Sequence, residues 1–102
     1  MVKVLRNSDV KRIIAFIPPG HKHVRLYVEF DNEKYVLQEA TIDAILRAYI
    51  NIITHPTRKA TELVVTHIKE KKQGYADYQH LETSRSEEEI ISEINEILKG
   101  II

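Results

Sequence analysis

The 102-residue sequence contains no cysteine and no tryptophan, and it has only three glycines and three prolines. Without cysteine the chain can form no disulfide, no thiolate nucleophile and no thiolate ligand set for zinc. Three glycines are too few for a glycine-rich phosphate-binding loop. No apolar run approaches the length of a membrane span, and the polar start MVKVLRNSD differs from a signal peptide. We therefore expect an intracellular protein that makes no membrane contact.

Net charge is also lacking, because 15 Lys and Arg balance 15 Asp and Glu. The balance is uneven along the chain: residues 1–60 hold ten basic and six acidic residues, and residues 61–102 hold five and nine. A general polyanion binder would be more basic than this. Frequent isoleucine, a single methionine and 29% charged residues are typical of a thermostable protein.

The strongest periodic pattern in the chain is TIDAILRAYINII, at residues 41–53. On a helix, its large apolar residues share one broad face, which comprises Ile42, Ile45, Leu46, Tyr49, Ile50, Ile52 and Ile53. The pattern predicts a mostly enclosed helix with Thr41 as its N-cap and Leu46 in the core. Ala44 and Ala48 leave a second interpretation open, because small side chains admit a close partner such as another helix or a second subunit.

A second helix is predicted at residues 86–99, where the apolar residues form a narrower stripe. Its start is marked by Ser86 with Glu89 and by Ser84 with Glu87, which both have the spacing of a capping box. The acidic first turn complements the helix dipole and is not interpreted as a metal site. This pattern is typical of a surface helix with one face on the core.

Strand patterns dominate the first forty residues. Residues 1–5 alternate and suggest a short edge strand, whereas residues 11–17 fit either a helix or a strand, and we favour the strand. Residues 18–20, Pro-Pro-Gly, indicate a turn with proline at its second position and glycine at positive φ. The alternation in residues 24–38 predicts a β-hairpin that runs directly into the first helix.

A second hairpin is predicted from strands at residues 62–68 and 75–81. The fold class is therefore α+β, with two β-hairpin–helix units in one compact domain. We expect a first half at residues 1–54, a joint at 55–60 and a second half at 61–102. The repeated order predicts an internal structural duplication, although an ordinary α+β domain can contain it by chance.

The chain resembles a small uncharacterised 102-residue protein of filamentous viruses that infect hyperthermophilic archaea, of the Acidianus filamentous virus type. The resemblance covers the whole chain and rests on its composition and on the ending EIISEINEILKGII. It implies an intracellular viral protein in the cytoplasm of a hot-environment host. It implies no activity, because no family motif and no functional residue accompany it.

The sequence suggests no catalytic residue, metal or cofactor. His21 and His23 could share one side of an extended segment, but they follow a turn and lack a further ligand at a defined spacing. His67 and His80 would face each other if the second hairpin closed tightly at Gly74. The carboxylates lie in a turn and at a helix start, where no partner would separate their pKa values for acid–base catalysis. We therefore expect a protein that is not an enzyme.

Two kinds of partner are considered. The function that we favour is a protein–protein interaction module, in which a groove along the seam between the halves binds a peptide at strand edges. Tyr27, Tyr75 and Tyr78 are its candidate contact residues, although each ring can equally pack within the chain. The partner would be viral, from the host, or a second copy in a homodimer.

The alternative is weak nucleic-acid binding through the second hairpin loop, as β-ribbon proteins bind a groove. The candidate residues are basic and lie in this loop or in the joint: Arg58, Lys59, Lys69, Lys71 and Lys72. Glu70 interrupts the run, and no aromatic residue alternates with these cations.

Overall fold

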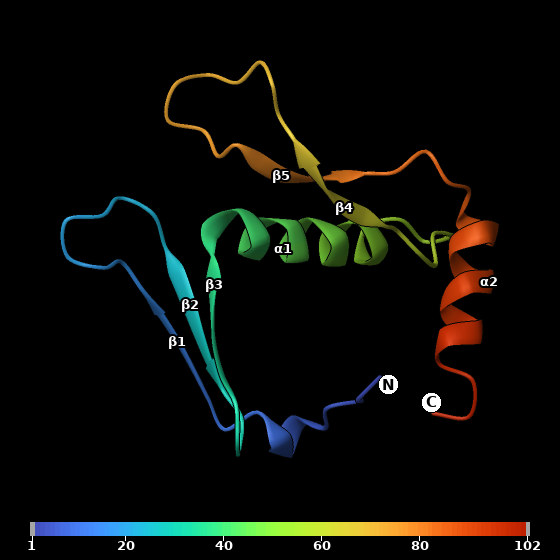
Figure 1. Cartoon of the computed structure of the whole chain (residues 1–102). Helices are drawn as coiled ribbons and strands as arrows, with labels where there is room; N and C mark the ends of the chain where they lie inside the picture. Colours follow the sequence, from blue (N-terminus) through green and yellow to red (C-terminus); the bar gives the residue numbers. More distant parts are fainter. Residues whose placement is uncertain (1, 102) are drawn as a thin grey trace. The chain divides into compact units, whose positions relative to one another are not determined.

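The computed structural model describes residues 2–101, which form two helices and two small antiparallel sheets (Figure 1). The elements are a 3-10 turn η1 (Asn7–Asp9), β1 (Arg12–Phe16), β2 (Arg25–Glu29), β3 (Lys34–Gln38), α1 (Glu39–Ile53), β4 (Leu63–His67), β5 (Tyr78–Glu82) and α2 (Glu87–Ile97). The strand order is β1-β2-β3 in one sheet and β4-β5 in the other. The predicted α+β class is therefore confirmed. The order hairpin then helix recurs, and the internal duplication stays a prediction.

The chain divides into two compact units between Ile42 and Asp43, inside α1. The first unit contains β1, β2 and β3, and the second contains most of α1 with β4, β5 and α2. The predicted joint, residues 55–60, lies within the second unit.

The first unit begins differently from the prediction. Residues 2–5 form no strand, so the predicted edge strand is wrong over the described residues, and Met1 lies outside them. The segment ends at η1, where the Asp9 carboxylate accepts the backbone N–H of Arg6 at 2.8 Å. A strand pattern of a few residues needs a neighbouring strand to bond with, and none pairs with this segment.

The turn at residues 18–20 is confirmed. The N–H of His21 donates to the carbonyl of Pro18 at 3.0 Å, and Gly20 has φ of 79°. Pro19 thus occupies the second position of the turn and glycine supplies the positive φ at the third. The turn reverses the chain so that β1 pairs antiparallel with β2, which confirms a strand at 12–16 over the helix alternative.

One face of the three-stranded sheet is wholly apolar. Directly opposite residues in antiparallel strands point to the same face. The register combines two apolar rows, Ile13–Val28–Tyr35 and Ala15–Leu26–Leu37. The other face is mixed and carries the rows Arg12–Glu29–Lys34, Ile14–Tyr27–Val36 and Phe16–Arg25–Gln38.

The first helix starts earlier than predicted. It begins at Glu39 with no loop after β3, so Thr41 lies inside the helix and is not its N-cap. The Glu39 carboxylate accepts the N–H of Val24 at 2.6 Å and lies 3.3 Å from Nδ1 of His23. These contacts join the helix start to the beginning of β2, and a carboxylate in the first turn also favours the helix dipole.

We expect Glu39 to make the first unit sensitive to acid. The Val24 N–H, followed by His23, lowers the pKa of Glu39 below its ordinary value. A lowered pKa in the folded state stabilises the fold above the ordinary carboxyl pKa of about 4.3, and this stability is lost as the pH falls through the lower value. The melting temperature of Glu39→Gln should therefore fall less below about pH 4 than that of the wild type. Equal slopes for the two proteins would contradict this role, and Glu88→Gln serves as the control.

The prediction that Leu46 of the first helix lies in the core is wrong. Ile45, Leu46 and Tyr49 are 54%, 53% and 61% exposed, whereas Ala44 is 5% exposed and is the single buried residue among residues 2–101. The side of α1 that carries Ala44 is turned toward β5, because Arg47, one turn further on, donates to the carbonyl of His80 at 2.9 Å. Ala44 and Ala48 lie on the less exposed side of the helix, whereas Leu46 and Tyr49 are exposed.

The second hairpin is confirmed with shifted strands. His67 lies opposite Tyr78, and Val65 lies opposite His80, so the two histidines do not face each other as they would in a tightly closed hairpin. The loop is longer than expected, and it is closed by a hydrogen bond from Ile68 N–H to the Asp77 carbonyl at 2.8 Å.

The predicted start of the second helix is confirmed. The N–H of Glu89 donates to Oγ of Ser86 at 3.2 Å, and the Ser86 hydroxyl donates to the Glu89 carboxylate at 3.2 Å. The helix ends at Ile97, two residues before the predicted end. No residue of α2 is buried.

Candidate functional site

An open hollow of about 620 Å³ lies beside the β2–β3 hairpin in the first unit. Its apolar lining consists of Leu5, Val28, Phe30, Tyr35 and Leu37. The rings of Phe30 and Tyr35 meet edge to face at 5.8 Å between their centres. The Tyr35 hydroxyl donates to Glu33 at 2.5 Å, and this bond raises the pKa of Tyr35. The remaining lining residues are charged or polar: Lys3, Asp9, Asp31, Asn32 and Glu33. The hollow therefore combines apolar walls with polar groups, which suits an apolar side chain of a ligand.

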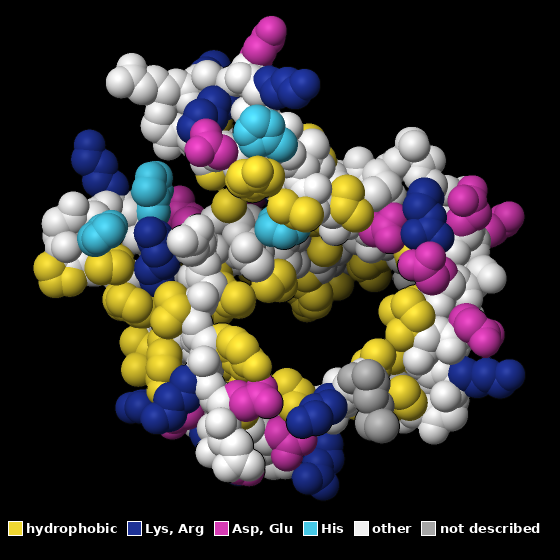
Figure 2. All heavy atoms as spheres, in the orientation of Figure 1, with side chains coloured by type: hydrophobic (Ala, Val, Ile, Leu, Met, Phe, Trp, Pro, Cys, Tyr) yellow, Lys and Arg dark blue, Asp and Glu magenta, His cyan; other side chains and the backbone are white. Residues whose placement is uncertain are grey.

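Hydrophobic side chains reach the surface over the first unit's sheet, as Figure 2 shows. Tyr35 is 51% exposed at the hollow, whereas Val36, which follows it on β3, is 56% exposed on the opposite face. Single exposed apolar residues are ordinary in proteins, but a contiguous apolar face indicates a contact surface.

Tyr27, the first candidate tyrosine, belongs to the mixed face of the same sheet. Its hydroxyl donates to Glu29 at 2.5 Å, and the guanidinium of Arg12 lies 5.6 Å from its ring centre. Arg12 also pairs with Glu29 at 3.0 Å. The Tyr27 hydroxyl and then Arg12 lower the pKa of Glu29, which favours the ionised form of this carboxyl group. Tyr27 is half-buried, and its polar end is already bonded within the sheet.

Tyr75 and Tyr78 belong to the second unit and are more accessible. Their exposed fractions are 56% and 60%. The ring of Tyr78 lies 5.0 Å from that of His67, its cross-strand neighbour, with a tilt of 49°. Tyr75 lies in the hairpin loop, where its carbonyl accepts the ammonium of Lys71 at 2.8 Å. The two tyrosines therefore lie three residues apart, with Tyr75 in the loop and Tyr78 at the start of β5.

The basic residues of the hairpin loop are partly neutralised. Lys71 forms an ion pair with Asp77 and lowers the pKa of that carboxyl group. Lys69 and Lys72 are exposed. This loop therefore presents less free positive charge than its sequence suggests.

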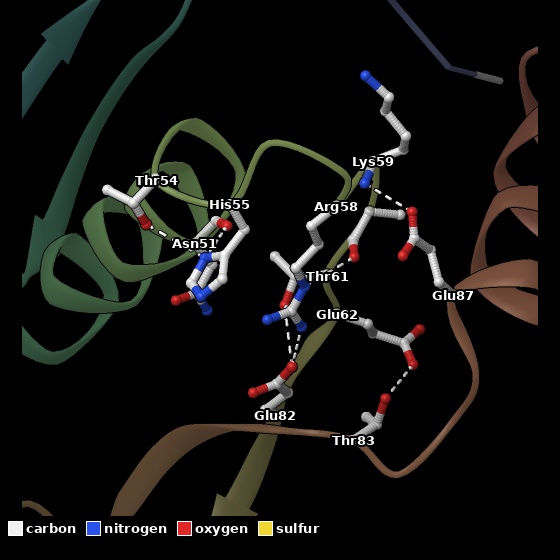
Figure 3. Close-up of polar contacts among 11 residues, drawn as sticks. Asn51, Thr54, His55, Arg58, Lys59, Thr61, Glu62, Glu82, Thr83 and Glu87 are labelled. Atoms are coloured by element: carbon white, nitrogen blue, oxygen red, sulfur yellow. Dashed lines mark hydrogen bonds and ion pairs between the residues drawn. The ribbon is translucent and has the colours of Figure 1, made fainter.

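The basic residues of the predicted joint have structural contacts (Figure 3). Arg58 forms an ion pair with Glu82 on β5, which lowers the pKa of Glu82, and it also donates to Oγ1 of Thr61 at 3.0 Å. The backbone N–H of Lys59 donates to the carboxylate of Glu87 at 2.6 Å, while its side chain is drawn away from these contacts (Figure 3). Residues 55–60 are thus attached to both β5 and α2.

Metal ligands do not gather in the part of the chain that the structure describes. Residues 2–101 contain no group of three or more His, Asp or Glu side chains that could hold a metal ion. Within the same residues, neither helix combines the length and apolar character that crossing a membrane requires.

The hollow was not identified from the sequence, although one signal was present. The alternation of residues 24–30 puts Val28 and Phe30 on one face of a strand, but Tyr35 and Leu37 join them only through the register of β3. No protein-family model, no curated protein and no solved structure matches this chain.

Proposed function

We propose that this chain is a non-enzymatic module that binds another protein, by adding an extended segment of its partner to the outer edge of β3. The hollow beside β3 is the observation that carries this proposal. The strand is the last in the order β1-β2-β3, and no described strand pairs with its outer side. A free edge supplies backbone hydrogen bonds to an extended peptide, and an adjacent pocket selects its side chains.

The chemistry of the partner follows from the faces of β3. Tyr35 and Leu37 lie on the apolar face and line the hollow. Side chains of an added strand that lie opposite these residues would point to the same face. The partner segment should therefore carry apolar residues at alternate positions, of which one enters the hollow.

Tyr75 and Tyr78 are proposed as further contact residues on the second unit. Tyrosine provides contact area and a hydroxyl group at low entropic cost. Their exposure supports this role, whereas the bonded hydroxyl of Tyr27 makes that residue the weakest of the three candidates.

A displayed library of short random peptides tests the proposal. We expect the purified protein to enrich peptides with alternating apolar residues, and Tyr35→Ala to bind them at least about tenfold more weakly, as for a central interface aromatic residue. Val36→Ala is the matched control, because it removes a similarly exposed side chain from the other face of the same strand. Fluorescence anisotropy with a labelled peptide measures the affinities.

Three results are informative about where a peptide binds. Enrichment of no sequence pattern would contradict peptide capture, and equal losses in Tyr35→Ala and Val36→Ala would contradict the hollow. A loss confined to Tyr75→Ala and Tyr78→Ala would place the contact on the second unit.

Nucleic-acid binding through the second hairpin loop is the other proposal, and it has less support because Arg58 and Lys71 are ion-paired. If it holds, binding of single- or double-stranded DNA or RNA at low salt should fall steeply at moderate salt, since phosphate contacts release counterions. It should also weaken in a Lys69→Ala/Lys72→Ala variant. An absence of binding at low salt would remove this alternative.

A further inference from the structure

β1 is an edge strand without the usual protection against pairing. All five of its residues are exposed, with Ile13 at 62%, and no strand among residues 2–101 pairs with its outer side (Figure 1). Free edges in stable proteins usually carry charge or proline. Here the two nearby cations are engaged within the unit, because Arg12 pairs with Glu29 at 3.0 Å and Lys11 pairs with Asp31 at 3.5 Å.

The directions of the backbone groups follow from one backbone hydrogen bond. The N–H of Phe30 donates to the carbonyl of Glu33 at 2.8 Å, next to the β2–β3 pairing. Val28 lies opposite Tyr35, two residues further along each strand. Val28 and Tyr35 therefore form a hydrogen-bonded pair as well. Bonded and non-bonded pairs alternate along antiparallel strands, so the backbone groups of Tyr27 face β1 instead of β3.

The same alternation defines the free edge. Tyr27 lies opposite Ile14, so the backbone N–H and C=O of Ile14 face β2. The N–H and C=O groups of Ile13 and Ala15 therefore face outward. They form two donors and two acceptors, spaced symmetrically about Ile14.

We propose that a second copy of this chain pairs with the first along β1, antiparallel and with the two-fold axis at Ile14. In this register Ile13 of each copy lies opposite Ala15 of the other, and each such pair exchanges two backbone hydrogen bonds. Ile14 lies opposite its own counterpart as a non-hydrogen-bonded pair. The result is one six-stranded antiparallel sheet with the self-complementary contact of a two-fold dimer.

The side chains are compatible with a second copy. Arg12 lies opposite Phe16 of the other chain, so no like charges face each other. Ile13 and Ala15 belong to the apolar face of the sheet, and the pairing makes the apolar faces of the two copies continuous. β1 and β3 are opposite edges of the sheet. The proposed dimer and the proposed peptide binding therefore use different strands, and an experiment can disprove one of them without disproving the other.

Single cysteines introduced into the cysteine-free chain test the register. Non-hydrogen-bonded pairs place their Cα atoms about 4.5 Å apart, within the range for a disulfide. Ile14→Cys should therefore oxidise mainly to a covalent dimer on a non-reducing gel. Phe16→Cys is the matched control on the same edge, because its counterpart lies four residues away, or about 13 Å. It should remain mainly monomeric.

Ala15→Pro provides an independent measurement in solution. Proline removes an outward N–H and leaves the bonds between β1 and β2 intact. Light scattering should show a concentration-dependent dimer for the wild type and a monomer for Ala15→Pro, with similar circular dichroism spectra. If Ala15→Pro unfolds, the cysteine comparison decides. A monomeric wild type, an unchanged dimer in folded Ala15→Pro, or equal crosslinking of the two cysteine variants would overturn the proposal.

Discussion

Replacing Ala44 with leucine should lower the free energy of unfolding by about 1–3 kcal/mol, the usual cost of overfilling a packed site. Ala44 is 5% exposed on the side of α1 that carries Arg47. A larger side chain would displace the atoms that cover Ala44, and we expect this to disturb the bond from Arg47 to the His80 carbonyl on the same side of the helix. Urea unfolding followed by circular dichroism measures this change.

Leu46→Ala is the matched control on the same helix. Leu46 is 53% exposed, so its truncation should change the free energy of unfolding by less than about 0.5 kcal/mol. The order of the two effects is the decisive result, because it reports which side of α1 is covered. A larger loss for Leu46→Ala than for Ala44→Leu would show that the helix is turned the other way.

Arg85→Ala should lower the melting temperature by several degrees, because this guanidinium joins the hairpin of the second unit to α2. It lies 3.1 Å from the carboxylate of Glu62, just before β4, and 3.2 Å from that of Glu93 on α2. Glu89 lies at 4.0 Å from the same guanidinium. The pKa of Arg85 is raised, first by its bond to Glu93, as expected for a cation among carboxylates. Its loss would leave these carboxylates to repel one another.

Two variants separate this contact from a general effect of charge. Lys99→Ala also removes one positive charge near α2, and no ion pair of Lys99 is present among residues 2–101, so its melting temperature should change little. Arg85→Lys should give an intermediate value, since an ammonium cannot bond two carboxylates in the planar geometry of guanidinium. If Lys99→Ala and Arg85→Ala melt at the same temperature, the network does not hold the helix.

Only part of the candidate site could be predicted from sequence patterns. Tyr75 and Tyr78 were named because tyrosine suits interfaces, and their exposure is consistent with that choice. The hollow beside Tyr35 could not be predicted, since it needs the register of β3 against β2. Similarly, nothing near Arg58 in the sequence indicates its pairing with Glu82, 24 residues later.

Sequence alone determined those features that depend on a few neighbouring residues. The turn at Pro18–Gly20 follows from the restricted φ of proline and the positive φ of glycine, and the start of α2 follows from the hydroxyl of Ser86. The hairpin of β2 and β3 follows from alternation, because the side chains of a strand point to opposite faces in turn. In each case the bonding partners lie within a short stretch of chain.

Tertiary structure decided which apolar surfaces are covered. Periodicity identifies the apolar side of α1. Which side is shielded from solvent depends on the distant element that lies next to the helix. Here Arg47 bonds a carbonyl 33 residues away, so the side that carries Ala44 is the one turned toward β5. The helix start at Glu39 is likewise joined to a distant partner, because its carboxylate accepts the N–H of Val24. A hydrogen bond joins one donor to one acceptor in a defined geometry, so the bond from Arg47 to the His80 carbonyl shows which side of α1 is turned toward β5, and the periodicity of the sequence contains no trace of that partner.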